Sequence, residues 1–249
     1  GHANVEMAVN SLKHGAFEFI EKPFDQTRLL NFVKRAVENL NLKTQNKEYE
    51  NKLFSSYELI GDSKNISTIR DQIDKISITE SRVIINGPSG SGKELIARKI
   101  HKKSKRNNKP FVILNGALLE ANKYELELFG EEKKDGSISY GALEKANKGT
   151  LLIDQVSEIP LVIQSKILRV LTDQKFKRLN GNNDINVDVR LICSSSKDLK
   201  DEIKVGNFRE DLYHRLNVFE INIKSLNERL SDIPLLIRYF SDKISENYN

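Results

Sequence analysis

Several residue types are scarce in this chain of 249 residues, which has one cysteine, one methionine and no tryptophan. Because Cys193 has no second cysteine to pair with, an intramolecular disulfide is excluded, and nothing in the sequence suggests a zinc site. No apolar stretch approaches the ~18 residues that a membrane-spanning helix needs, and no signal-peptide pattern is visible. The sequence therefore predicts a cytoplasmic protein without membrane contact.

Charged residues are abundant, at 30% of the chain, and hydrophobic residues make up 38%. This composition is sufficient for a packed core beneath a strongly charged surface. The net charge of +5 is compatible with nucleic-acid binding. However, the lysines are scattered among asparagine and isoleucine, which favours compositional bias over a dedicated DNA-binding face. The chain begins at Gly1 without an initiator methionine, and we expect it to be a piece of a longer protein.

One glycine-rich stretch carries the clearest chemistry. The apolar run Val83–Ile85 ends in a loop from Gly87 to Lys93, and a helical pattern follows from Glu94. A phosphate-binding loop needs this order of strand, loop and helix. Its glycines let backbone N–H groups point at a phosphate, and the helix N-terminus and lysine add positive charge. The alternative is a plain glycine-rich turn before a helix, and Glu94 stands where Ser or Thr is usual.

The periodicity of apolar residues predicts two regions. Residues 4–14 and a segment from Gln26 to about Leu40 have helical spacing, with a strand-like stretch at 16–20 between them. From about residue 57, short apolar strands alternate with helices, which predicts an α/β fold with a parallel sheet and helices on both faces. The expected strands are 83–85, 111–115, 149–154, 188–193 and 219–223, and the expected helices are 65–76, 94–103 and 161–173.

Asp154 ends the apolar run Leu151–Ile153. In a parallel sheet, ligands bind at the carboxyl ends of the strands, where both Asp154 and the loop at Gly87–Lys93 are expected. An acidic residue at that place holds Mg²⁺ directly or through water.

The chain from about Leu59 resembles the AAA+ domain of sigma-54-dependent transcription activators of the NtrC type, with the NtrX branch nearest. The matching stretches are 59–61, 87–94, 127–130, 149–154, 164–171, 207–218 and 228–234. Glu94 after the lysine is usual in this family. Residues 15–24 resemble the end of a response-regulator receiver domain, in which Lys22 would contact the phosphoryl group.

The resemblance implies a domain order. We expect residues 1–37 to be the end of a flavodoxin-like receiver and 38–56 a helical linker. Residues 57–232 would form an AAA+ P-loop NTPase three-layer sandwich, and 233–249 would begin a truncated helical lid. It also implies a sensor histidine kinase, RNA polymerase with sigma-54, self-association into a dimer or ring, and DNA as partners. DNA would be bound by a C-terminal helix-turn-helix outside this chain.

The resemblance also implies residue roles, with ATP and Mg²⁺ as cofactors. Leu59, Ile60 and Gly61 would line the adenine pocket. The residues expected to wrap the phosphates are Gly87, Pro88, Ser89, Gly90, Ser91, Gly92, Lys93 and Glu94, with Asp154 for Mg²⁺ and Ser196 in the sensor stretch. Asn115 would report the nucleotide state, and Arg209 and Arg215 would act as arginine fingers on a neighbouring subunit. Without the resemblance, these two arginines would be taken as ordinary surface residues.

Three departures from the family pattern are visible, and the mildest is the sensor stretch Cys193–Leu199, which has Ser where the family usually has Thr and Asn or His. Gln155 stands where active members have the glutamate that serves as general base, and an amide cannot accept that proton, so we expect ATP to be held and hydrolysed slowly or not at all. Glu158 is the alternative base. The Gly-Ala-Phe-Thr-Gly-Ala loop that contacts sigma-54 is absent from residues 131–144, where Ile138 and Tyr140 offer a different contact.

Three interpretations therefore remain at this point. The first is an ATP-binding transcription regulator of a two-component system with weak or no ATP turnover. The second is a working ATPase that remodels RNA polymerase. The third is a receiver-linked interaction module without nucleotide, supported by the helical segment from Gln26.

Overall fold

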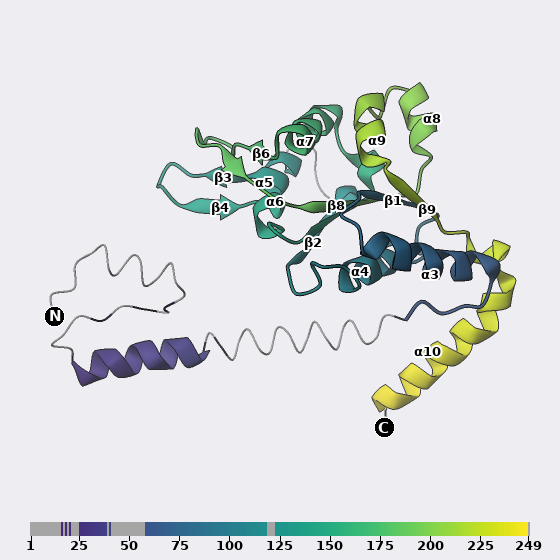
Figure 1. The fold of residues 1–249 in the computed structure, drawn as a ribbon, viewed down its shortest axis with the longest axis horizontal. Helices are drawn as coiled ribbons and strands as arrows, with labels where there is room; N and C mark the ends of the chain where they lie inside the picture. The colour runs from purple at the N-terminus through teal and green to yellow at the C-terminus, as the bar shows by residue number, and fades with distance from the viewer. Residues whose placement is uncertain are drawn as a thin grey trace. The chain divides into compact units, whose positions relative to one another are not determined.

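The computed structural model describes residues 16, 18, 20, 25–38, 40, 58–118 and 123–248. The chain divides into two units, Gly1–Tyr57 and Glu58–Asn249, which are described separately, and Figure 1 shows the elements of each. In the first unit a helix covers residues 26–38. It begins directly after Asp25, whose carbonyl oxygen accepts a hydrogen bond from Leu29 N at 3.1 Å.

Most of the expected receiver segment lies outside the described residues, including the helix at 4–14 and Lys22. Of the strand expected at 16–20, Ala16, Glu18 and Ile20 are described, and none of the three is in a strand.

The second unit is built on a five-stranded parallel sheet in the order β2-β5-β8-β1-β9. Its central strands are short apolar runs because both of their faces are buried, as expected for a parallel sheet. All five strands expected from the sequence are present. The strands are β1 (Val83–Asn86), β2 (Phe111–Asn115), β3 (Gly130–Glu132), β4 (Ile138–Tyr140), β5 (Thr150–Asp154), β6 (Lys175–Phe176), β7 (Ile185–Asn186), β8 (Arg190–Ser195) and β9 (Phe219–Asn222).

Helices cover both faces of this sheet, which confirms the three-layer α/β fold (Figure 1). Because side chains alternate along a strand, Leu152 packs with α3 and α4 on one face, while Leu151 and Ile153 join α7 and α9 on the other. The helices are α3 (Lys64–Ser77), α4 (Lys93–Lys102), α5 (Tyr124–Phe129), α6 (Ala142–Lys145), α7 (Leu161–Asp173), α8 (Leu199–Lys204), α9 (Glu210–Leu216) and α10 (Ile233–Tyr248), with short 3₁₀ turns η1 (Gly116–Leu118), η2 (Val156–Glu158), η3 (Leu226–Glu228) and η4 (Leu230–Asp232).

Side chains hold both ends of α3. At its start, Ser63 Oγ accepts a hydrogen bond from Ile66 N at 3.4 Å. Near its end, the buried guanidinium of Arg190 donates to Ile76 O at 3.0 Å and to Ser81 O in the following turn at 3.3 Å. These contacts provide partners for backbone groups that have none within a helix, and they join α3 to the amino end of β8.

Two small antiparallel ribbons, β3–β4 and β6–β7, were not expected from the sequence. The turn between β3 and β4 contains Asp135 and Gly136, and Gly136 has a φ of +82°. The Asp-Gly pair in this turn is a sequence pattern typical of hairpins and could have predicted the ribbon. Leu179 joins the β6–β7 ribbon segment to the first ribbon, since its N–H donates to Gly130 O and its carbonyl accepts from Glu132 N, both at 3.0 Å.

Among the described residues, no helix combines the length and the apolar character needed to cross a lipid bilayer.

Candidate nucleotide-binding site

The glycine-rich loop lies at the carboxyl end of β1, directly before α4. Gly87, Gly90 and Gly92 have φ values of +156°, +73° and +103°, which other residues rarely adopt. A Cβ on Gly87 would approach Ile223 Cγ2 to 2.4 Å and Ile223 O to 2.5 Å, so the first position of the loop accepts only glycine. The loop therefore has the backbone that a phosphate cradle requires.

Two side chains of this loop can form further hydrogen bonds with a ligand. The Nζ of Lys93 donates to Gly87 O at 2.8 Å and Pro88 O at 2.9 Å, and the side chain is buried. Burial lowers the pKa of Lys93, and the nearby Asp154 carboxylate opposes this effect. Ser91 Oγ is buried without a hydrogen-bond partner in the described part of the chain. A phosphate oxygen would satisfy both groups, so the residues present fit a nucleotide.

The carboxyl end of β5 lies at the same edge of the sheet as this loop, and one strand, β8, separates β5 from β1. Asp154 Oδ1 accepts a hydrogen bond from Ser194 Oγ, and the same oxygen of Ser194 accepts from Gln155 N at 3.1 Å. Gln155 has a φ of +56°, in the left-handed region. A non-glycine residue held in this conformation is strained, and such residues concentrate at functional sites.

The Gln155 amide bonds the sensor stretch. Its Oε1 accepts from Ser196 N at 3.1 Å and from Ser196 Oγ at 2.8 Å. Asn115 pairs in register with Asp154 on the neighbouring strand, but its Oδ1 accepts from Ala117 N at 3.0 Å. In this state Asn115 therefore bonds its own turn, while Gln155 bonds Ser196.

A cleft of about 380 Å³ opens beside these residues. It is lined by Ser89 of the phosphate loop and by Gln155, Glu158 and Ser196. The carboxylate of Glu158 forms an ion pair with Lys197 Nζ at 2.9 Å, and its side chain is 37% exposed. The cleft thus contains both Gln155 and the alternative base considered from the sequence.

A buried carboxylate from the far end of the domain holds the two residues that follow Leu59–Gly61, the segment expected to contact adenine. Asp232 accepts hydrogen bonds from Asp62 N at 2.7 Å, Ser63 N at 2.8 Å and Ser63 Oγ at 2.7 Å. Burial alone would raise the pKa of Asp232, but the bonds from Ser63 and Asp62 outweigh it and the pKa is lowered. Gly61 has no room for a side chain, because a Cβ would lie 2.6 Å from this carboxyl group.

Arg229 connects Asp232 with the phosphate loop. Its guanidinium lies 3.6 Å from Asp232 Oδ2 and donates to Ser91 O at 3.4 Å. Sequence reasoning did not assign roles to Arg229 or Asp232, although both lie in the stretch 228–234 that carries the family resemblance. The matching stretch marked these two residues, but it did not reveal that Asp232 contacts a residue 170 positions earlier in the chain.

Both expected finger arginines are exposed. Arg209 precedes α9 and pairs with Asp211 through contacts of 2.6 and 3.0 Å, while its Nη1 donates to Ser165 Oγ at 3.1 Å. Arg215, near the end of α9, donates to Leu171 O at 3.5 Å. A role for Arg209 in a neighbouring subunit would therefore require release from Asp211.

The sheet order, the glycine loop after β1 and the acidic end of β5 define an AAA+ P-loop domain. Residues 59–222 match the family described as the sigma-54 interaction domain, and the chain belongs to this family.

Individual relatives agree with this assignment. The nitrogen assimilation regulatory protein NtrX of Azorhizobium caulinodans is 44% identical over 247 residues, which are 99% of this chain and 54% of that protein. A structure of NtrX from Brucella abortus has a TM-score of 0.78 at 42% identity and covers 99% of this chain and 55% of that one. The same Brucella protein in complex with ATP has a TM-score of 0.75 at 42% identity, covering 98% and 56%. The similarity to NtrC-type regulators and their NtrX branch is confirmed, and this chain spans about half the length of these relatives.

Proposed function

We propose that this chain is the nucleotide-binding part of a transcription regulator of the NtrC type, which binds Mg·ATP and hydrolyses it slowly or not at all. The observation that carries the proposal is Gln155, an amide at the end of β5 whose oxygen already accepts two hydrogen bonds from Ser196. A general base typically contributes 10²–10⁴-fold to a rate. Gln155 cannot supply this contribution.

ATP binding is supported by two polar groups of the loop that can form hydrogen bonds with phosphate oxygens. Lys93 would exchange its two carbonyl partners for the β- and γ-phosphates, and Ser91 Oγ would gain a partner. A Mg²⁺ ion would be held by phosphate oxygens and by Asp154 at the carboxyl end of β5. Such an ion neutralises charge on the phosphates. The Brucella relative has been crystallised with ATP and with ADP.

The test measures Mg·ATP binding and phosphate release on the same sample, beside Gln155→Glu. We expect saturable binding with little turnover in the unmodified chain and an increase in turnover in the variant. Lys93→Ala serves as the control with weakened binding. Turnover typical of active ring ATPases in the unmodified chain would refute the weak-hydrolysis part of the proposal.

Glu158 favours a second candidate, a working ATPase that remodels RNA polymerase. Its carboxylate lies in the same cleft as Gln155 and is bound by Lys197 rather than by a buried group. If the unmodified chain hydrolyses ATP and Glu158→Gln abolishes this activity while ATP binding persists, Glu158 is the base and this candidate replaces the first.

The partners follow from the same assignment. The β3–β4 ribbon occupies the place of the missing sigma-54 loop, and it exposes Ile138 and Tyr140 at 45% and 55%. We assign it the contact with RNA polymerase. In the first unit, Leu30, Val33, Val37 and Leu40 are exposed at the spacing of a coiled-coil seam, which supports self-association. A sensor kinase, DNA and a cytoplasmic location complete the proposal for the whole protein.

A further inference from the structure

A second hollow lies at the opposite end of the sheet from the phosphate loop. It has a volume of about 510 Å³ and is bounded by the amino ends of β1, β5 and β8 and by α7. Its walls are apolar and include Leu143, Leu151, Val170 and Leu191, all members of the core on the α7 face. We call it the amino-end pocket. Sites for small molecules typically have ~300–1,000 Å³, apolar walls and a few polar groups.

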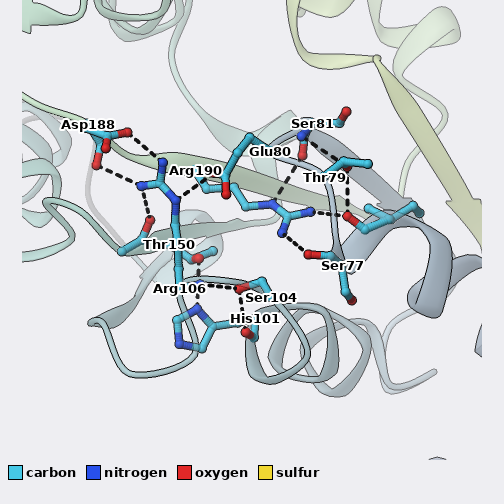
Figure 2. A network of polar contacts seen from close by, with 12 residues as sticks. Ser77, Thr79, Glu80, Ser81, His101, Ser104, Arg106, Thr150, Asp188 and Arg190 are labelled. Carbon is cyan, nitrogen blue, oxygen red and sulfur yellow. Dashed lines mark hydrogen bonds and ion pairs between the residues drawn. The ribbon is translucent and has the colours of Figure 1, made fainter.

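Most charged groups at the mouth of the amino-end pocket are bonded to one another. Arg106 lies between Glu80 and Asp188, with Nε 2.7 Å from Glu80 Oε2 and Nη2 2.7 Å from Asp188 Oδ1 (Figure 2). The guanidinium of Arg190 donates to backbone carbonyls at the end of α3 and in the turn that follows. The two carboxylates at the mouth are therefore both paired with Arg106.

Arg82 is the exception at this mouth. It is half-buried and lines the pocket, and it has no hydrogen bond or ion pair within the described ranges. Burial lowers the pKa of Arg82, and repulsion from Arg215 lowers it further, against a smaller opposing effect of Cys193. Arg215 lies nearby, since it donates to Leu171 O at 3.5 Å and Leu171 also lines the pocket. Arg82 therefore lines an apolar hollow without a bonded anion, because the two carboxylates of the mouth, Glu80 and Asp188, are paired with Arg106.

We propose that the amino-end pocket binds a small amphipathic carboxylate, whose hydrocarbon chain fills the hollow and whose carboxylate is held by Arg82 with Arg215 beside it. An arginine binds a carboxylate through two parallel N–H···O bonds, and a half-buried guanidinium without an anion gains most from such a partner. The apolar walls give the chain of the ligand a place out of water. This site is separate from the nucleotide site, so its occupation does not require ATP.

The first experiment compares octanoate, octanol and octylamine on the 249-residue chain by titration calorimetry. These probes share the length of their hydrocarbon chain and differ in the charge of the head group. We expect saturable binding of octanoate, weaker binding of octanol and none of octylamine. Equal affinity for octanol and octanoate would refute the role of the arginines, and absence of saturable octanoate binding would refute the site.

Variants then test the residues. Arg82→Gln should weaken octanoate binding at least tenfold, because it removes a charge-assisted contact. Arg169→Gln is the matched control, since the Arg169 side chain is 83% exposed on α7, and it should leave binding unchanged. Val189→Phe places a larger side chain into the pocket and should abolish binding, with circular dichroism confirming that each variant is folded.

Unchanged octanoate affinity in both Arg82→Gln and Val189→Phe would place the ligand elsewhere and overturn the proposal. Sedimentation of the same proteins distinguishes a second occupant. If octanoate does not bind and Arg82→Gln reduces self-association, the pocket is an interface between copies of the chain and the proposal is also overturned.

Discussion

The two ends of the central sheet differ in how their charged groups are satisfied. At the carboxyl end, Lys93 bonds only carbonyl oxygens of its own loop, and Ser91 Oγ is buried without a partner in the described residues. At the amino end, Arg106 donates to carboxylates and carbonyls, and Arg190 donates to three backbone carbonyls. Polar groups at the carboxyl end have hydrogen-bonding capacity left for a ligand, whereas those at the amino end use theirs to stabilise the fold. Arg82 lies at the amino end, but like the groups at the carboxyl end it has hydrogen-bonding capacity left for a ligand.

Removal of Arg190 should have the largest effect on stability. Arg190→Ala leaves several carbonyls at the end of α3 without a donor, and we expect a loss of about 3 kcal/mol in the free energy of unfolding. Urea denaturation measures it, with Lys204→Ala as the control, because that exposed lysine forms a surface ion pair with Asp201. If both variants lose the same small amount of unfolding free energy, the contacts of Arg190 do not stabilise the fold.

Lys93→Ala should have the opposite profile. It should weaken ATP binding about 30-fold, which is roughly 2 kcal/mol, while the urea midpoint stays close to that of the unmodified chain. The comparison would fail if this substitution destabilised the fold as strongly as Arg190→Ala.

His101 provides a pH test of the amino end. It is buried against Phe111, with its Nδ1 2.9 Å from Thr150 Oγ1, and burial first, with repulsion from Arg190 and Arg98, lowers the pKa of His101 to about 4 (Figure 2). Because the folded pKa lies below the unfolded value of about 6.5, this contribution to stability is complete above pH 6.5. It is lost as the pH falls toward 4, since the unfolded chain binds the proton first.

Urea denaturation at pH 7 and pH 5 should therefore show a loss of stability that His101→Gln reduces. His214→Gln is the control, since that side chain is exposed at 70%. An equal pH dependence in all three proteins would mean that His101 does not carry the effect.

The smallest effect should come from Glu80, one of the two exposed carboxylates that pair with Arg106. Glu80→Gln removes one carboxylate that is 51% exposed, while Asp188 keeps its bond to the same guanidinium. We expect a change of about 0.5 kcal/mol in urea denaturation, and less at high salt. A loss as large as that of Arg190→Ala would show that the pair is not screened by solvent.

Features encoded locally could be predicted from the sequence. The phosphate loop, Asp154 and the five strands each depend on residues close together in the chain, such as the apolar run before Gly87. The pairing of Asp232 with Ser63 spans 169 positions and leaves no periodic signal. The bonding of Gln155 with Ser196, and the lack of a partner for Arg82 among the described residues, depend likewise on which strands become neighbours. The β3–β4 ribbon was missed because its strands have three residues each, too few for a pattern of alternation.

Arg229 lies between the phosphate loop and the start of α10. It bonds Ser91 in the phosphate loop and contacts Asp232, after which α10 begins. Thermodynamic linkage makes any coupling through this guanidinium reciprocal. If bound phosphate displaces the Ser91 carbonyl, the equilibrium orientation of α10 changes, and a partner that fixes α10 must change the ATP affinity by the same factor.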